Sequence, residues 1–389
     1  MKRSQPDAVS HYLAWAKLHS NARFNLAASG VLDYPLAELP VHVGDLEIGG
    51  TGPYGYPPLM ERLAAKAGVP EECVVYTLGT SMANFVALTA LVHRGDEVLI
   101  ERPTYDPLLT ILDHIGANVC RFDRLAEKGF QLGLGELERK LTPQTRLVIL
   151  CNLHNPSAAL TDESALRQAG EMAAKVGARV LVDEVYLETL FDQPWRSAFH
   201  LGSNFVVTSS LTKAYGLSGI RCGWILAQPE LIQRMWQIID FTYGSPVHPA
   251  ELLAVVVLDN LNRVRDRARA LLETNRVLVN EFLARHPDLE CAPSRFGTTV
   301  FPRLRMGPVS YTHLLPPLLP ALRRAERLRF RPWSRPGGPT RTAQSVFPES
   351  RCAHRSPRCV TRHENCSVRV LPPRLGRRHP LFRRANTNR

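Results

Sequence analysis

The chain has 389 residues, of which 44% are hydrophobic and 22% are charged, as is ordinary for a globular protein with a large core. Its formal net charge is +12, yet residues 307–389 hold 18 of the 48 basic residues and only 3 of the 36 acidic ones. That segment carries +15, and the first 306 residues carry −3. The body of the chain lacks the basic excess of a nucleic-acid-binding protein, which argues against nucleic acid as a partner.

The N-terminal residues are basic but contain no continuous apolar segment, and we predict no secretory signal. The longest apolar runs, such as LLAVVVL at 252–258, are far too short to span a bilayer. The eight cysteines form no CxxC pair. We therefore expect a cytoplasmic protein with reduced thiols that binds neither a membrane nor a metal ion.

From residue 80 to residue 213 the chain alternates between helical and strand periodicity. A helical pattern at 81–95 is followed by apolar strands at 96–101 and 146–152, a helix at 163–177, and strands at 178–186 and 205–210. Near-continuous Val, Ile and Leu strands separated by helices are typical of a parallel sheet covered on both faces. The sequence thus predicts an α/β fold.

Polar residues stand where these strands end, and a glycine-led turn opens the first helix. The residues concerned are Gly79, Thr80, Ser81, Tyr105, Asn155, Asp183, Tyr186, Ser210 and Lys213. Because ligands bind at the carboxyl ends of the strands in parallel sheets, we expect these groups to converge on one site. Taken singly, the turn at 79–81 is better interpreted as a plain helix cap.

Several of these groups suit a phosphate and a protonated ring. The helix N-terminus at 79–81, the Ser210 hydroxyl and the Arg221 guanidinium are all anion-binding groups. Asp183 ends an apolar strand without a neighbouring Arg or Lys, so its carboxylate needs a protonated partner such as a ring nitrogen. Lys213 offers an amine that condenses with an aldehyde.

The remaining groups complete one cofactor. Asn155 and Tyr186 could both donate hydrogen bonds to a phenolate oxygen, and Tyr105 offers a flat face for stacking. A phosphate clasp, an acidic partner for a ring nitrogen, phenolate donors and a Schiff-base lysine together predict pyridoxal 5'-phosphate.

Five segments resemble motifs of the class I/II aminotransferases, in the fold type I (aspartate aminotransferase) superfamily. They are YTLGTSMANF (76–85), RPTYDP (102–107), NLHNPSA (152–158), VDEVY (182–186) and SSLTKAYGLSGIRCGW (209–224). Their order and spacing agree with the family over roughly residues 25–300. One departure is Ala158, where the family usually has glycine.

The resemblance implies a large domain with a mostly parallel seven-stranded sheet sandwiched by helices, and a small α+β C-terminal domain that looks incomplete. It implies that Lys213 forms the Schiff base and then moves the proton as general base and acid. Asp183 would keep the ring nitrogen protonated, and Asn155 and Tyr186 would hold the phenolic oxygen.

The resemblance also implies substrate contacts and a dimer. Gly30, in FNLAASG, would lie near the substrate carboxylate. Asn155 would also contact the substrate. In family dimers a tyrosine reaches the phosphate of the neighbouring subunit, and Tyr54 is a possible match. Arg369, in SVRV, matches the substrate-binding arginine of the family too weakly to be assigned that role.

We divide the chain into four parts. They are an N-terminal arm with the start of the small domain (1–45), the large cofactor-binding domain (46–245), a connecting helix with the start of the C-terminal small domain (246–306), and an atypical segment (307–389). The last part has 12 prolines and no sustained helical or alternating pattern. It is either a disordered basic extension or, as we prefer, a frameshifted or chimeric reading of the small-domain gene.

The sequence as a whole predicts a cytoplasmic, homodimeric enzyme that moves an amino group between an amino acid and a 2-oxo acid. Another fold type I activity, such as a C–S lyase or a decarboxylase, would use the same cofactor residues. A pyridoxal-phosphate-binding protein made inactive by its aberrant C-terminus is a further alternative. A regulatory protein with a basic nucleic-acid-binding segment is a third, although no helix-turn-helix segment precedes the cofactor domain.

Overall fold

The computed structural model describes residues 10–18, 20, 21, 25, 28–50, 52, 54–292 and 295–305. The predictions made for residues 307–389 lie outside the described residues. The helices are α1 (His11–Leu18), α2 (Pro57–Ala67), α3 (Thr80–Leu91), α4 (Asp106–Ile115), α5 (Leu134–Lys140), α6 (Glu163–Lys175), α7 (Thr212–Tyr215), α8 (Pro229–Thr242), α9 (His248–Asp259) and α10 (Leu261–Ala284). The strands are β1 (Val74–Leu78), β2 (Glu97–Arg102), β3 (Asn118–Asp123), β4 (Thr145–Cys151), β5 (Arg179–Asp183), β6 (Phe205–Ser210), β7 (Cys222–Leu226), β8 (Leu289–Glu290) and β9 (Arg303–Leu304).

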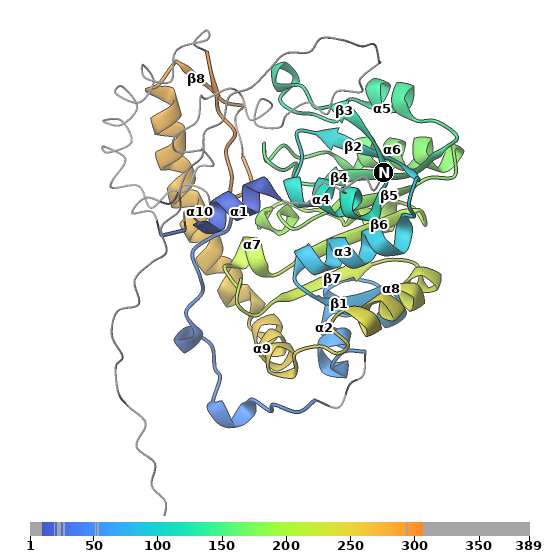
Figure 1. The fold of residues 1–389 in the computed structure, drawn as a ribbon. Helices are drawn as coiled ribbons and strands as arrows, with labels where there is room; N and C mark the ends of the chain where they lie inside the picture. The colour runs from blue at the N-terminus through green and yellow to red at the C-terminus, as the bar shows by residue number, and fades with distance from the viewer. Residues whose placement is uncertain are drawn as a thin grey trace, which may run out of the picture. The chain divides into compact units, whose positions relative to one another are not determined.

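Seven strands form one sheet in the order β1-β7-β6-β5-β4-β2-β3 (Figure 1). Strand β7 pairs antiparallel with both of its neighbours, β1 and β6. All the other neighbouring pairs are parallel. The predicted α/β fold with a mostly parallel seven-stranded sheet is therefore confirmed.

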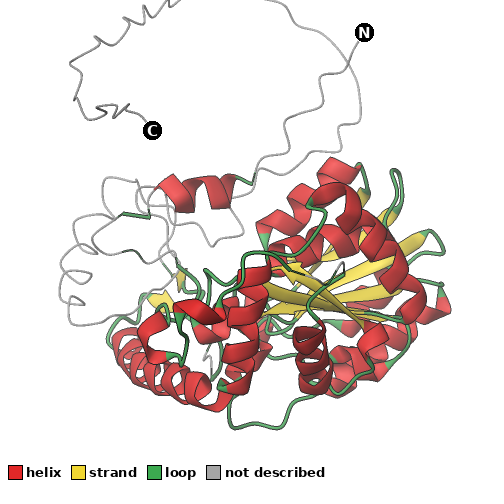
Figure 2. Cartoon of the chain, turned by 90° about the horizontal axis from the view of Figure 1, so that it is seen from below, coloured by secondary structure: helices red, strands yellow, loops and turns green. Residues whose placement is uncertain are grey.

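The sheet is buried on both faces, which explains why its strands are nearly continuous apolar runs. In β4, Val148 and Leu150 belong to one apolar core, and Leu147 and Ile149 belong to the other. Helices α3, α4 and α8 supply the core on the second of these faces, and α2, α5, α6 and α9 supply the core on the first. Figure 2 shows helices on both sides of the sheet.

Strands β1, β2, β4, β5 and β6 run in the same direction, so their carboxyl ends lie at one edge of the sheet. The residues at or just after these ends include Gly79, Tyr105, Asn155, Asp183 and Ser210. The fold therefore brings segments that are far apart in the sequence to one place, where ligands bind in sheets of this kind.

Beyond the sheet, α10 runs from the first core, where Val264 and Ala268 are buried, toward a short antiparallel ribbon of β8 and β9. Figure 1 shows α10 on the side of the sheet where α7 lies, and the two helices are in contact. None of the helices in the described residues is both long and apolar enough to cross a membrane. The five cysteines in the described residues are all free thiols.

Candidate cofactor site and active site

A polar corner forms where the N-terminus of α3 meets the end of β6. The Thr80 hydroxyl donates a hydrogen bond to Ser210 Oγ at 2.7 Å, and Arg221 Nη2 donates to the Leu78 carbonyl at 3.0 Å. Gly79 has a φ of 81°, and a Cβ built on it would lie 2.4 Å from Arg221 Nη2. A side chain at this position would displace the guanidinium. The corner thus combines helix N–H groups, hydroxyls and an arginine, which suits an anion.

The turn before β7 aims Arg221 at this corner. Its backbone lies in the left-handed region with a φ of 54°, a conformation that costs a non-glycine residue roughly 1–3 kcal/mol. Arg221 Nη1 donates to the Ser218 carbonyl at 3.1 Å, which fixes the side chain. Gly223 packs so closely on Gly79 that a Cβ there would lie 2.5 Å from the Gly79 carbonyl carbon. Backbone strain held in place at a polar corner is typical of a functional site.

Asp183 places a buried carboxylate at the end of β5, with 4% of the residue exposed. Oδ2 accepts from Asn84 Nδ2 at 2.8 Å, and Oδ1 accepts from the Val185 N–H at 3.1 Å. The Thr208 hydroxyl donates to Asn84 Oδ1 at 2.6 Å and so fixes the orientation of the amide. Within the described residues, Asp183 forms no ion pair. Burial raises the pKa of Asp183 from 3.8 to about 6, against the opposing effects of the two hydrogen bonds and of Lys213.

Lys213 lies at the start of α7, with its side chain half-buried. Its Nζ donates to Ser29 Oγ at 2.9 Å. Burial and the positive charge of Arg221 lower the pKa of Lys213, and the carboxylate of Asp183 opposes them. A larger fraction of this amine is therefore neutral at a given pH than for a solvated lysine, as a nucleophile or a general base requires.

Two phenols flank Asp183. Burial raises the pKa of Tyr105 and of Tyr186 above the usual value, so both side chains are neutral hydrogen-bond donors. Tyr105 is hydrogen-bonded to Ser81, and Tyr186 to Ser29. The charge of Asp183 raises the pKa of both phenols and of the lysine amine.

The loop after β4 carries Asn155 and rests on a buried ion pair. Glu101 and Arg124 are both fully buried, and Arg124 Nε lies 2.7 Å from Glu101 Oε2. Glu101 Oε1 accepts from the Cys151 N–H at 2.7 Å, and Arg124 Nη1 donates to Thr161 Oγ1 at 3.0 Å. The ion pair therefore holds the loop at both of its ends.

His154 connects this loop to the segment that carries Tyr105. Its ring nitrogens lie 2.6 Å from Ser157 Oγ and 3.0 Å from the Pro103 carbonyl oxygen. Burial lowers the pKa of His154 well below its usual value, so the ring is neutral. These contacts give His154 a structural role.

Most of the residues predicted to form the site lie together in the structure. They are Gly79, Thr80, Ser81, Tyr105, Asp183, Tyr186, Ser210, Lys213 and Arg221, with Asn155 in the loop that follows the strand paired with β5. Gly30 packs against Lys213, because a Cβ built on it would lie 3.5 Å from the Lys213 carbonyl oxygen. Tyr54 lies elsewhere, 48% exposed, with its ring centroid 5.2 Å from that of Trp236.

The sequence did not indicate four polar residues that support the site. Ser29 contacts the lysine amine, Asn84 contacts Asp183, and Glu101 and Arg124 underlie the loop of Asn155. Asn84 could have been found, because it is the one amide in an otherwise apolar stretch of α3, four residues after Thr80. For Ser29 the sequence offers no comparable signal.

The arrangement fits pyridoxal 5'-phosphate. The anion corner suits the phosphate, and the half-buried amine of Lys213 suits an aldehyde. The strongest indication is Asp183, a buried carboxylate whose hydrogen bonds come from neutral groups alone and which a protonated ring nitrogen would pair. Fold and site together define a pyridoxal-phosphate-dependent enzyme of fold type I.

Comparison with known proteins gives the family. Residues 47–336 match the model of the family "aminotransferase class I and II", so the chain belongs to that family. This confirms the predicted class, a pyridoxal-phosphate-dependent aminotransferase.

Individual relatives agree with the family assignment. The chain is 30% identical to capreomycidine synthase of Streptomyces vinaceus over 294 residues, which are 72% of this chain and 76% of that protein. It is 26% identical to the aspartate aminotransferase of Sulfolobus acidocaldarius over 265 residues, 65% of this chain and 66%, just under two thirds, of that protein. Among solved structures, a pyridoxal-phosphate-dependent aminotransferase of Streptococcus suis superposes with a TM-score of 0.72 at 25% identity, over 79% of this chain and 84% of that one.

Proposed function

We propose that the chain transfers an amino group between an amino acid and a 2-oxo acid with Lys213 as the catalytic amine. The observation that supports this assignment is the carboxylate of Asp183, which is buried and forms no ion pair within the described residues, together with the lowered pKa of the Lys213 amine. When bound, pyridoxal phosphate supplies an aldehyde that takes the amino group and a ring that accepts the electrons released at the α-carbon.

The residues of the chain then divide the work of binding and proton transfer. Lys213 Nζ takes and returns the α-proton, helped by the lowered pKa of its amine and held by Ser29. Asp183 would keep a proton on the ring nitrogen. Tyr186 and Asn155 would donate hydrogen bonds to the phenolic oxygen.

The rest of the site binds and orients. The turn at 79–81, Ser210 and Arg221 would hold the phosphate, and Tyr105 would offer a flat face to the ring. Gly30 leaves room near the lysine for the substrate carboxylate, since its missing side chain would contact Lys213. The segment of Gly30 is also held against the backbone of α7, because the Val31 N–H donates to the Lys213 carbonyl at 3.1 Å.

The test is the visible absorption of the full chain mixed with pyridoxal phosphate, beside the variant Lys213→Ala. We expect a visible band in the wild type only, and we expect an amino acid to bleach it while a 2-oxo acid accumulates. A band that is equal in the two proteins would show that Lys213 is not the reactive amine. A lysine-dependent band that no amino acid changes would contradict transamination while leaving the cofactor site in place.

A homodimer in the cytoplasm is part of this proposal. Large apolar side chains are exposed in the segment that precedes α2, at Val43, Ile48 and Tyr54, and in α8, at Phe241. The ring of Tyr54 also lies 5.2 Å from that of Trp236 in α8. Exposed apolar groups are typical of a subunit interface, and Tyr54 would then face the neighbouring subunit. Sedimentation velocity of the full chain tests this, because a single monomeric species at micromolar concentration would contradict it.

The C–S lyase and decarboxylase alternatives would use the same cofactor residues. Neither relative described above is named for such an activity, and the family is that of the aminotransferases. Product analysis separates them, since a lyase releases ammonia without a 2-oxo acid acceptor and a decarboxylase releases carbon dioxide.

A further inference from the structure

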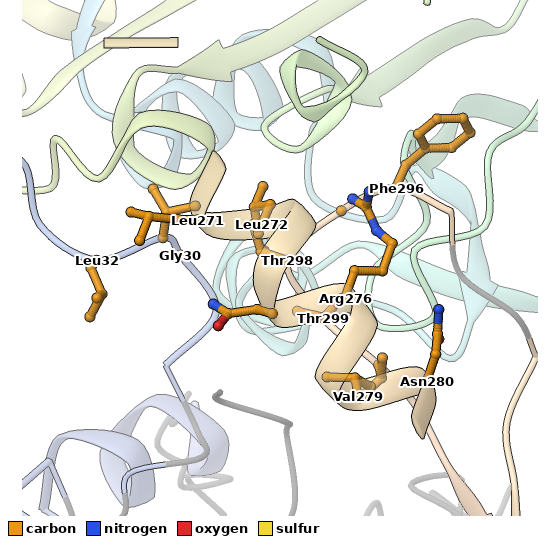
Figure 3. A pocket seen from close by; sticks show the side chains of 14 residues that line it. Gly30, Leu32, Leu271, Leu272, Arg276, Val279, Asn280, Phe296, Thr298 and Thr299 are labelled. Atoms are coloured by element: carbon orange, nitrogen blue, oxygen red, sulfur yellow. The ribbon is translucent and has the colours of Figure 1, made fainter. Parts of the chain in front are cut away.

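A cavity lies near Lys213, on the other side of residues 29–32 from its amine. It is bounded by residues 30–32, by one side of α10 between 271 and 280, and by residues 296–300 (Figure 3). Its volume is about 60 Å³. Since one water needs roughly 10–15 Å³ measured in this way, the cavity has room for roughly four to six water-sized groups. This is the size of a small organic acid rather than of a cofactor.

The polar chemistry of this cavity is cationic. Arg276 extends from α10 along the cavity toward Phe296 (Figure 3), and Asn275 precedes it on the same helix. None of the described residues that line the cavity is Asp or Glu. The hydroxyls of Thr298 and Thr299 donate to the backbone carbonyls of Ser29 and Pro156, at 2.6 and 3.1 Å. Their donors are used, so donors for a ligand must come from α10.

The donors of Arg276 are available. In the part of the chain that the structure describes, its guanidinium forms no hydrogen bond and no ion pair, and the charge that acts on it is that of Glu273 on the same helix. Partial burial lowers the pKa of Arg276. An arginine nevertheless stays charged at neutral pH, so the cavity holds a partly desolvated cation that has no ion-pair partner among the described residues.

The cavity and the reactive amine share a thin wall. Gly30 lines the cavity, and a Cβ built on it would lie 3.6 Å from Lys213 Cδ. On the cavity side, Thr298 Oγ1 donates to the Ser29 carbonyl, and on the other side Lys213 Nζ donates to Ser29 Oγ at 2.9 Å. An anion bound in the cavity would therefore be separated from the amine of Lys213 by one residue of backbone.

We propose that Arg276 forms a carboxylate-binding subsite next to Lys213, and that its ligand is a small organic carboxylate. The planar guanidinium matches a carboxylate with two parallel hydrogen bonds. Leu271, Leu272 and Val279, which also line the cavity, would pack against the carbon chain of the ligand. The structure favours the carboxylate of a separate acid, because residues 29 and 30 stand between the cavity and the amine of Lys213. The distal carboxylate of a dicarboxylic substrate is the other outcome of the test, and in that case the inference rests on the proposed function.

The first experiment measures binding and does not depend on turnover. Glutarate is titrated into the cofactor-loaded full chain by isothermal calorimetry, with the neutral glutaramide as the comparison ligand. Glutarate should bind and glutaramide should not. Arg276→Gln should weaken glutarate binding by about ten- to a hundredfold, the effect of losing a charged hydrogen-bond pair. Arg263→Gln is the matched control, because Arg263 is an exposed arginine of the same helix outside the cavity.

Equal binding of glutarate by the wild type and by Arg276→Gln, or no binding by the wild type, would overturn the proposal. Circular dichroism and thermal melting of each variant show whether it folds. If Arg276→Gln does not fold, Arg276→Lys decides, because a point charge without the planar fork should still weaken binding severalfold.

The second experiment identifies the source of the carboxylate. If it belongs to the substrate, Arg276→Gln should raise KM for glutamate about tenfold or more, with kcat and the KM for alanine nearly unchanged. If it belongs to a separate acid, KM for both amino acids should stay as in the wild type, while glutarate alters the rate without competing with them. Should no transamination be seen at all, the calorimetric result still stands by itself, so failure of the proposed function is not mistaken for failure of the subsite.

Discussion

Asp183 should destabilise the cofactor-free protein near neutral pH. Burial raises its pKa from 3.8 to about 6, so the folded state binds the proton more tightly than the unfolded state does. Protonated Asp183 therefore contributes stability that is fully present below about pH 4. That contribution is lost as the pH rises through about 6, where the buried carboxyl loses its proton, and it is absent at higher pH. The free energy of unfolding should therefore fall across this window.

The magnitude follows from the size of the shift. About two pKa units correspond to about 3 kcal/mol. Asp183→Asn keeps the shape of the side chain and removes its titration. Because the new amide nitrogen must face an N–H donor, either Asn84 Nδ2 or the Val185 N–H, the variant loses one hydrogen bond at every pH, at about 1–2 kcal/mol. This offset leaves the pH-dependent part unchanged.

We therefore expect the stability of Asp183→Asn relative to the wild type to rise by about 2–2.5 kcal/mol between pH 4 and pH 7, both proteins being free of cofactor. Urea unfolding at a series of pH values measures this difference. Asp162→Asn is the control, because the Ala165 N–H donates to that carboxylate at 2.8 Å and lowers its pKa, so its effect has the opposite sign. A stability difference for Asp183→Asn that does not vary with pH would refute the argument that the buried carboxylate lacks a partner.

Three further changes test the supports of the site. Gly79→Ala puts a Cβ 2.4 Å from Arg221 Nη2, at a residue whose φ is 81°. The affinity for the cofactor, measured by equilibrium dialysis, should therefore fall about tenfold or more. An unchanged affinity would exclude a role of this corner in phosphate binding. Arg124→Met leaves Glu101 buried without a partner and should lower stability by about 3–5 kcal/mol, a fall of about 6–20 °C in melting temperature, whereas adding Glu101→Gln should recover much of it. Equal melting of the single and double variants would contradict this. Ser29→Ala removes the acceptor of the lysine amine and should move the acid limb of the kcat profile to lower pH, and a profile identical to that of the wild type would show that the contact is incidental.

Local sequence patterns predicted the parallel centre of the sheet well. The predicted strands at 96–101, 146–152 and 205–210 coincide with β2, β4 and β6 to within about one residue at each end. The strand predicted at 178–186 ends earlier, at Asp183, because Leu187–Thr189 forms a 3-10 helix that starts from Tyr186. The helix predicted at 81–95 ends at Leu91, where the next residue turns to an extended backbone.

Strands β1 and β7 were not predicted, for a physical reason. Each has five residues, and β7 contains a glycine and follows the loop that carries Arg221, so its local pattern is that of the loop. Their register is set by pairing between distant segments, with Val74 opposite Leu226. Pairing over such a separation leaves no periodicity in a short window of sequence.

The same limit applies to the site. A local sequence pattern shows where each parallel strand ends, and ligands bind at these ends. The main residues of the site could therefore be found from the sequence. Contacts between distant segments were not readable. Ser29 meets Lys213 across 184 positions and Asn84 meets Asp183 across 99, and neither pair shares a local motif. Polar groups that support a site through tertiary contact need the fold before they can be found.

The unfavourable features of this protein are concentrated at one edge of its sheet. Asp183 is charged and buried, Lys213 is partly desolvated beside Arg221, and Arg221 has a strained backbone. A phosphate relieves the charge of Arg221, and a protonated ring relieves that of Asp183, so a cofactor with both groups binds the folded state alone. Binding of this kind stabilises the fold by about 2.7 kcal/mol at a hundredfold excess over the dissociation constant. The apolar cores on the two faces of the sheet supply the stability that offsets these unfavourable charges in the cofactor-free protein. Removing the charge of Asp183 should therefore strengthen the cofactor-free fold near neutral pH while weakening the cofactor site.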